Sequence, residues 1–166
     1  MYREVLLAHN EQPHHFYALS QPTHAAHGHN PLCGDEITVH LRIESDRIKE
    51  ISFTGQGCAI CKASASLMTL SLEGLSVTDA EKDAQGILKW LNDATAEQPD
   101  NLGELEALLG VRKFPMRIKC ATLAWHAVLK ALNQPAISDK HEGSACGCCG
   151  EGSGSKHPNG SCGCGS

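Results

Sequence analysis

Aromatic residues are scarce in this sequence. Phe, Trp and Tyr make up 4% of its 166 residues, although hydrophobic residues as a whole make up 41%. A buried core must therefore consist mainly of aliphatic and alanine side chains. The length is enough for one compact domain with such a core and a tail, and it is short for two large domains.

A cluster of basic residues and a long apolar run are also missing. The formal net charge is -5 and the Lys and Arg residues are not grouped, which argues against a nucleic-acid surface because neutralising phosphates requires clustered cations. No run approaches a membrane span, and the start, Met1 to Leu7, lacks the features of a secretory signal. We therefore expect a cytoplasmic protein that binds neither nucleic acid nor membrane.

Cysteine, in contrast, is plentiful, with nine residues, and there are ten histidines. In a reducing compartment these thiols are better explained as metal or redox groups than as disulfides, and the odd count fits that explanation. Five of the histidines lie between Gln12 and Asn30, together with two prolines. Because they lack a regular helical spacing, we interpret this stretch as a solvated loop, in which any strand would be short, rather than as a metal site.

Hydrophobic periodicity predicts a mixed α and β chain. Apolar residues alternate with polar ones from Ile37 to Ile43, as in a half-buried strand, and Ile51 to Thr54 form the antiparallel partner after a turn at Glu44 to Arg47. The expected helices are, in chain order, Tyr2 to Asn10, Cys58 to Gly74, a helix from the capping box Thr78 to Glu81 that fades at Asn92, Leu102 to Gly110, and a last helix that begins near Cys120 and ends before Pro135. In the helix after Cys58, the expected apolar face consists of Ile60, Ala63, Leu67 and Leu70.

Cys58 stands where the second strand gives way to this helix of small residues. Free backbone N–H groups and the positive end of the helix dipole favour a thiolate at such a position. The sequence therefore predicts that Cys58 is a nucleophile or a metal ligand.

Cys58 and Cys61 also match the C-x-x-C pattern of thioredoxin-like oxidoreductases. The βαβ setting and the later cis-proline strand of that family are not evident, so we interpret Cys61 as a small buried helix residue or an auxiliary thiol.

Three further residues offer metal ligands beside Cys58. Cys33 and Asp35 are two residues apart, so in an extended backbone they share a face and can reach one ion; a turn cysteine next to an exposed aspartate explains them equally well. Cys120 lies near the start of the last helix. Its position is consistent with a thiolate ligand and also with an ordinary buried cysteine. Together, these three thiols and one carboxylate would complete a tetrahedral zinc site. The same four residues suit iron, and the single oxygen ligand would make a bound cluster easier to release. Their spacing in the sequence alone does not exclude that the four residues are unrelated.

Three motifs, in order along the chain, match one protein family. They are Asn30-Pro31-Leu32-Cys33-Gly34-Asp35, Gly57-Cys58 with Ala63-Ser64-Ala65-Ser66, and Phe114-Pro115-Met116-Arg117-Ile118-Lys119-Cys120-Ala121-Thr122-Leu123-Ala124-Trp125. From Tyr2 to about Leu132 the chain resembles the SufU-type members of the IscU/NifU N-terminal family of iron-sulfur cluster assembly proteins. The resemblance implies an α+β sandwich, in which helices cover one side of a short antiparallel sheet. It also implies an assembly domain over residues 1–133. The composition changes after Asn133 to Gly, Ser, His and Cys, so residues 134–166 are expected to be a disordered tail.

The resemblance further implies a function in the SUF system. Zinc would be bound by Cys33, Asp35, Cys58 and Cys120, and the partner would be a SufS-type, pyridoxal-phosphate-dependent cysteine desulfurase. Cys33, on a flexible turn, would accept sulfur from the desulfurase, so that the protein acts as a zinc-dependent sulfurtransferase and desulfurase activator rather than a classical enzyme. The alternative is a scaffold that builds a transient [2Fe-2S] cluster on the same ligands and passes it to downstream assembly proteins or apoproteins.

Two departures from IscU scaffolds favour the SufU type. Lys119 stands immediately before Cys120, where IscU proteins carry a histidine, and the helical insert between Glu73 and Phe114 is longer than theirs. Arg117 could stabilise a thiolate of the site or form a surface ion pair.

A third hypothesis, metal storage, relies on the histidines and the five tail cysteines Cys146, Cys148, Cys149, Cys162 and Cys164.

Overall fold

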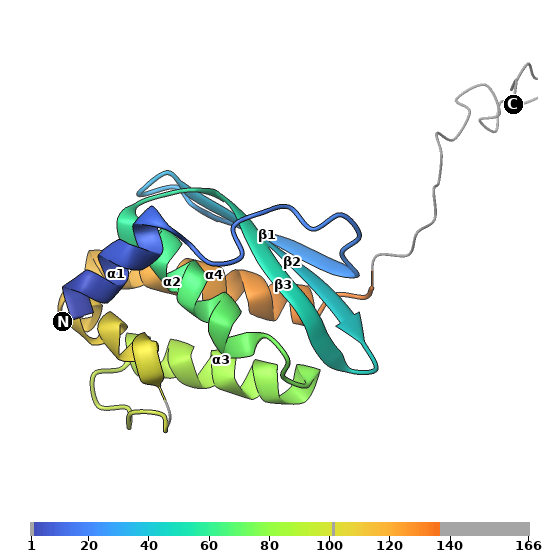
Figure 1. Ribbon diagram of the computed structural model, residues 1–166. Coiled ribbons are helices and arrows are strands. Elements are labelled where there is room, and N and C mark those ends of the chain that lie inside the picture. Colours follow the sequence, from blue (N-terminus) through green and yellow to red (C-terminus); the bar gives the residue numbers. More distant parts are fainter. Residues whose placement is uncertain (1, 101, 137–166) are drawn as a thin grey trace, which may run out of the picture.

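The chain folds around an antiparallel sheet of three strands in the order β1-β2-β3. The structure, a computed structural model, describes residues 2–100 and 102–136, so the tail cysteines lie outside the described residues. The elements are, in chain order, α1 (Tyr2–Glu11), β1 (His24–Asn30), β2 (Asp35–Glu44), β3 (Arg47–Gln56), α2 (Ala59–Leu72), α3 (Val77–Asn92), the 3-10 helix η1 (Gly103–Lys113) and α4 (Pro115–Leu132). The helices gather on one side of the sheet (Figure 1), which confirms the expected α+β sandwich.

The strand register brings three chain segments to one end of the sheet. Asn30 pairs with Asp35 at the β1-β2 turn, and Glu36 pairs with Gln56 where β3 ends. The turn that carries Cys33 and the start of α2 therefore meet at this end. At the opposite end, the predicted hairpin turn is confirmed, with Ser45 and Asp46 at φ values of 51° and 59°. Positive φ at both central residues matches the twist of the flanking strands.

The helix layer closes over the inner face of the sheet. The α4 helix contacts β1 and β2, while α2 contacts β3 and α4. Small residues allow the close approach of α2 and α4: Ser64 Oγ donates to Ala121 O at 2.6 Å and accepts from Trp125 Nε1 at 3.1 Å. Both Ser64 and Trp125 are fully buried. Among the described residues, no helix has the length and apolar character needed to cross a membrane.

Three details of the sequence-based prediction were wrong. The histidine-rich stretch was expected to be a loop, but His24–Asn30 form β1, because pairing with β2 satisfies their backbone groups. Leu70 was assigned to the apolar face of α2 but is 41% exposed. The N-cap of α3 is Ser76, which accepts a hydrogen bond from Asp79 N at 3.2 Å, rather than the predicted capping box at Thr78.

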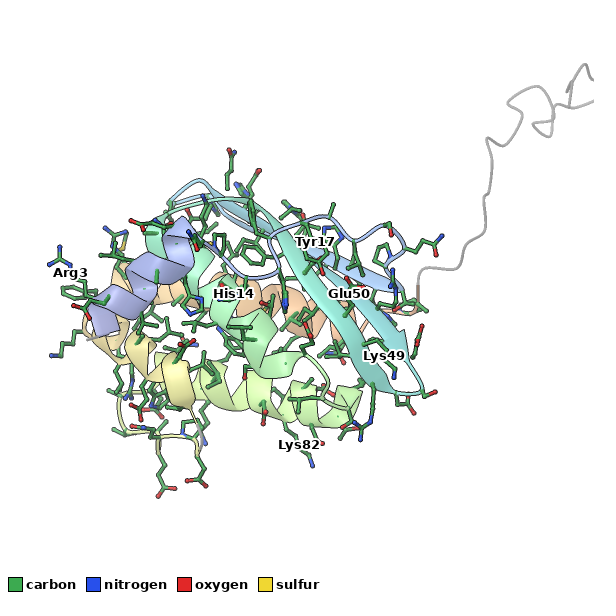
Figure 2. The ribbon with its side chains drawn as sticks, viewed as in Figure 1. Arg3, His14, Tyr17, Lys49, Glu50 and Lys82 are labelled. Atoms are coloured by element: carbon green, nitrogen blue, oxygen red, sulfur yellow. The ribbon has the colours of Figure 1, made fainter. Side chains whose placement is uncertain are left out.

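The segment between α1 and β1 runs along the outer edge of β3. Phe53 N donates to His15 O at 3.0 Å, and the rings of Phe16 and Phe53 pack with centroids 5.1 Å apart. Further along, the Tyr17 hydroxyl donates to the Glu50 carboxylate at 2.6 Å, and Figure 2 shows the two residues close together over β3. This segment partly covers a strand edge that would otherwise be open to pairing with another chain.

A buried histidine ties α1 to the rest of the helix layer. His9 is 5% exposed; its Nδ1 lies 2.8 Å from Ser66 Oγ and its Nε2 lies 3.1 Å from a Glu104 carboxylate oxygen. Since a carboxylate only accepts, Nε2 donates to Glu104 and Nδ1 accepts from the Ser66 hydroxyl in the neutral ring. Ser66 Oγ also accepts from His14 N at 2.8 Å. Ser66 therefore joins three segments of the chain.

Ser66→Ala is expected to lower the free energy of unfolding by about 1 to 3 kcal/mol, because it leaves His9 Nδ1 and His14 N–H without a partner. Urea unfolding followed by circular dichroism measures the change. The control is Ser71→Ala on the same helix, a half-buried position where a change within about 0.5 kcal/mol is expected. Equal losses in both variants would contradict a specific role for the Ser66 hydroxyl.

Candidate metal centre

The four residues singled out in the sequence lie on four different segments at the same end of the sheet. Cys33 lies in the turn between β1 and β2, and Asp35 is the first residue of β2. Cys58 is the N-cap of α2, as the sequence predicted, with extended dihedral angles (φ -68°, ψ 166°). Cys120 lies in the second turn of α4.

Three of the four candidate donors have ligand atoms close enough to share one ion. The sulfurs of Cys33 and Cys120 are 3.5 Å apart, and Cys58 Sγ is 3.8 Å from Asp35 Oδ2. One ligand atom from each of Cys33, Asp35 and Cys120 lies within 4.8 Å of the others. In a tetrahedral zinc site with bonds of about 2.0 to 2.3 Å, neighbouring donors are roughly 3.5 to 3.8 Å apart. Cys33, Asp35 and Cys120 therefore fit zinc in chemistry and in spacing, whereas Cys58 lies outside this group and contacts it through Asp35.

Burial is graded across the site. Cys120 is fully buried and Asp35 is 1% exposed, whereas Cys58 is half-buried and Cys33 is exposed. Three donors are thus anchored in the protein, and one thiol faces solvent on a turn. A partner can reach Cys33 without disturbing the core.

Two glycines position Asp35 and the start of α2. Cys58 N donates to Asp35 Oδ1 at 3.0 Å, so the carboxylate caps the helix and orients the site at once. A Cβ on Gly57 would lie 3.0 Å from that oxygen, and a Cβ on Gly55 would lie 2.0 Å from the Glu36 carbonyl oxygen. Gly55 also has a φ of 136°, which side chains rarely adopt. The Gly-x-Gly-Cys sequence is therefore needed for this close approach.

Cys120 differs from the expectation for its position. It was expected at the electropositive start of the last helix, but α4 begins at Pro115, and the dipole effect is confined to the first turn. Burial raises the pKa of the Cys120 thiol, and hydrogen bonds with Asp35, Cys33 and Cys58 raise it further. Without a metal this thiol keeps its proton. A bound dication reverses the balance, because a coordinating thiol is deprotonated.

The turn that carries Cys33 and the start of α4, the helix that carries Cys120, bear exposed apolar residues that the sequence analysis did not single out. Leu32 is 64% exposed, Phe114 59% and Met116 60%. Arg3, Phe114 and Arg117 line, with Ala59 and Ile60, a cavity of about 650 Å³. Arg117 is itself exposed.

The remaining candidates lie elsewhere. His24, His27 and His29 are on β1 and do not join the cluster of Cys33, Asp35 and Cys120. Cys61 is fully buried in α2, one turn after Cys58. Burial raises the pKa of the Cys61 thiol, with smaller contributions from the negative charges of Asp35, Cys58 and Cys33. Cys61 therefore lies directly behind the site, as the interpretation of a buried residue or auxiliary thiol expected.

Comparison with known proteins finds relatives over about four-fifths of the chain. The family model of the NifU-like N terminal domain matches residues 1–134. The chain is 38% identical over 136 residues to the iron-sulfur cluster assembly scaffold protein IscU of Streptococcus pyogenes, covering 82% of this chain and 85% of that protein. It is 35% identical over 132 residues to the zinc-dependent sulfurtransferase SufU of Bacillus subtilis, covering 80% and 89%.

A solved structure shares the fold as well. The chain superposes with a TM-score of 0.72 on a protein described as an iron-sulfur cluster assembly scaffold for the SUF system of Fervidobacterium islandicum AW-1. The sequence identity is 25%, and the match covers 78% of this chain and 94% of the other.

Proposed function

Because the chain belongs to the NifU-like N-terminal domain family, we propose that it works in iron-sulfur cluster assembly by accepting sulfur from a cysteine desulfurase at Cys33. One observation carries this proposal: of four donors gathered at one end of the sheet, Cys33 alone is exposed. A site built to shield all its ligands would bury that thiol. A site built to deliver one thiol to a partner needs it on a turn.

In this proposal Asp35, Cys58 and Cys120 hold zinc, and Cys33 is its exchangeable fourth ligand. Bound zinc supplies positive charge that keeps the thiols deprotonated. Once released to the partner, the Cys33 thiolate attacks the terminal sulfur of the persulfide on the desulfurase. The sulfur–sulfur bond breaks, the desulfurase cysteine leaves as a thiolate, and Cys33 carries the sulfur as a persulfide.

Exposed side chains on the Cys33 turn, on α1 and at the start of α4 support docking of a protein partner. Leu32, Phe114 and Met116 offer apolar area, and Arg3 and Arg117 offer positive charge beside it. Exposed apolar groups rimmed by charge are typical of interaction surfaces. The partner expected here presents its own persulfide cysteine on a segment that reaches the Cys33 turn.

The proposal is tested with a SUF-type cysteine desulfurase, cysteine and the zinc-loaded chain. We expect faster alanine formation and, in samples alkylated early in the reaction, one added sulfur atom on the peptide that contains Cys33, identified by mass spectrometry. The same chain stripped with a chelator is expected to lose most of the stimulation. If the sulfur stays on the desulfurase and alanine formation is unchanged by the zinc-loaded chain, the sulfur-acceptor function is wrong.

A second function is favoured by the comparisons. The IscU relative is as similar to the chain as the SufU relative, and thiolates with one carboxylate also hold iron. The chain would then assemble a [2Fe-2S] cluster on the same donors and pass it to apoproteins. Lys119 in place of a histidine beside Cys120 favours the sulfur-acceptor function instead.

A further inference from the structure

Cys61 has no part in the function proposed above, although it lies against the site. A Cβ built on Gly57 would be 3.2 Å from Cys61 Cβ and 3.0 Å from Asp35 Oδ1. The three thiols Cys33, Cys58 and Cys61 are respectively exposed, half-buried and fully buried. They form a series that runs from the surface into the protein.

The positions of Cys58 and Cys61 allow a bond between them. Residues three apart on a helix are neighbours, with Cβ atoms about 5 to 6 Å apart, and a disulfide needs about 3.5 to 4.5 Å. Cys58 is the N-cap and has extended dihedral angles, so the helix does not fix its side chain. Its sulfur has a 3.8 Å contact with Asp35 Oδ2. Closing the remaining distance requires a backbone adjustment at the N-cap, because rotating a side chain does not move its Cβ.

Sulfur accepted as a persulfide is at the oxidation level of elemental sulfur, whereas clusters contain sulfide, so two electrons must be supplied. Resting on the sulfur acceptance proposed at Cys33, we propose that Cys58 and Cys61 form an internal dithiol that reduces the Cys33 persulfide and releases sulfide. Cys58 is the attacking thiol and Cys61 the resolving thiol. The buried position of Cys61 protects it from other oxidants until Cys58 has reacted.

The reaction has two thiol exchanges. The Cys58 thiolate attacks the inner sulfur of the Cys33 persulfide; a Cys33–Cys58 disulfide forms and hydrosulfide leaves. Cys61 then attacks the Cys58 sulfur, which forms the Cys58–Cys61 disulfide, frees the Cys33 thiolate and gives the Cys61 proton to hydrosulfide. Two thiols are oxidised and one sulfane sulfur is reduced to sulfide. An external dithiol reductant restores the pair for the next turnover.

Cys120 is the competing partner, since its sulfur is 3.5 Å from that of Cys33. A Cys33–Cys120 disulfide would release sulfide too, but it would block the acceptor thiol. The Cys58–Cys61 bond leaves Cys33 free. The position of the disulfide after one turnover therefore distinguishes the two routes.

The test is a single turnover with persulfide-loaded desulfurase, freed of cysteine and added reductant, and an equal amount of the zinc-loaded full chain. We expect about one sulfide per chain, a Cys58–Cys61 disulfide in the peptide map, and zinc release, because Cys58 must leave the metal to react. In Cys61→Ala and Cys61→Ser the first exchange still releases one sulfide, but the chain should stop as a Cys33–Cys58 disulfide that accepts no further sulfur. Ala65→Ser, on the same buried helix face with Cys61 retained, is the matched control.

Two results would overturn the internal dithiol while leaving sulfur acceptance intact. One is recovery of Cys33 as a free thiol, with no Cys33–Cys58 disulfide, in the Cys61 variants. The other is a Cys33–Cys120 disulfide as the product. If no sulfur reaches Cys33 in any variant, both proposals fail.

Discussion

Cys33→Ala is expected to lower sulfur transfer from the desulfurase more than about 100-fold, because the variant lacks the nucleophile that breaks the persulfide bond. The fold should remain, since Cys33 is exposed on a turn and such substitutions change stability by about 0.5 kcal/mol or less. Persulfide on the chain, measured by mass spectrometry, and the denaturation midpoint of the metal-free protein separate the two effects.

Cys33→Ser and His29→Ala complete that experiment. A serine hydroxyl is a far weaker nucleophile than a thiolate, so Cys33→Ser should fail as Cys33→Ala does. His29 is exposed on β1 near the same turn, and His29→Ala should accept sulfur normally. Unchanged stimulation of the desulfurase by Cys33→Ala would exclude Cys33 as the acceptor.

Asp35→Asn and Asp35→Ala are expected to weaken zinc binding by about 100-fold or more, because each removes the only charged oxygen donor of the site. The two variants differ in one hydrogen bond. Asparagine can still accept from Cys58 N, which donates to Asp35 Oδ1 at 3.0 Å, and alanine cannot. Asp35→Ala should therefore be less stable than Asp35→Asn by about 1 to 3 kcal/mol in the metal-free state.

A competitive chelator titration measures the zinc affinity, and urea unfolding in excess chelator measures the stability. Wild-type affinity in both variants would remove Asp35 from the proposed ligand set. Equal stability of the two variants would show that Asp35 does not stabilise the start of α2. The chelator titration would then still decide whether Asp35 is a zinc ligand.

The sequence predicted those elements whose own residues carry the pattern. Alternation from Ile37 to Ile43 marked β2, and the Gly-flanked Cys58 marked the start of α2. The strand β1 could not be predicted in this way. Its buried residues are Ala26 and Asn30, so it lacks an apolar face and becomes a strand only through its register with β2. Local patterns do not contain that information.

The same distinction applies to the site. Residue type and spacing singled out four candidate donors, because soft thiolates and a carboxylate near turns and helix starts are typical metal ligands. Their separation and graded burial depend on which strand and helix ends meet. The exposed position of Leu70 and the depth of Cys120 in α4 are likewise set by packing between elements. Tertiary contacts override the local helical pattern at both positions.

The most direct test of the account is the metal and acid-labile sulfide content, with a visible spectrum, of the protein purified without oxygen from its own host. The account predicts a colourless protein with about one zinc per chain and no sulfide, as expected for a site of three thiolates and one carboxylate. Iron and sulfide in equal amounts, with thiolate-to-iron absorption, would contradict it and establish a cluster scaffold in its place.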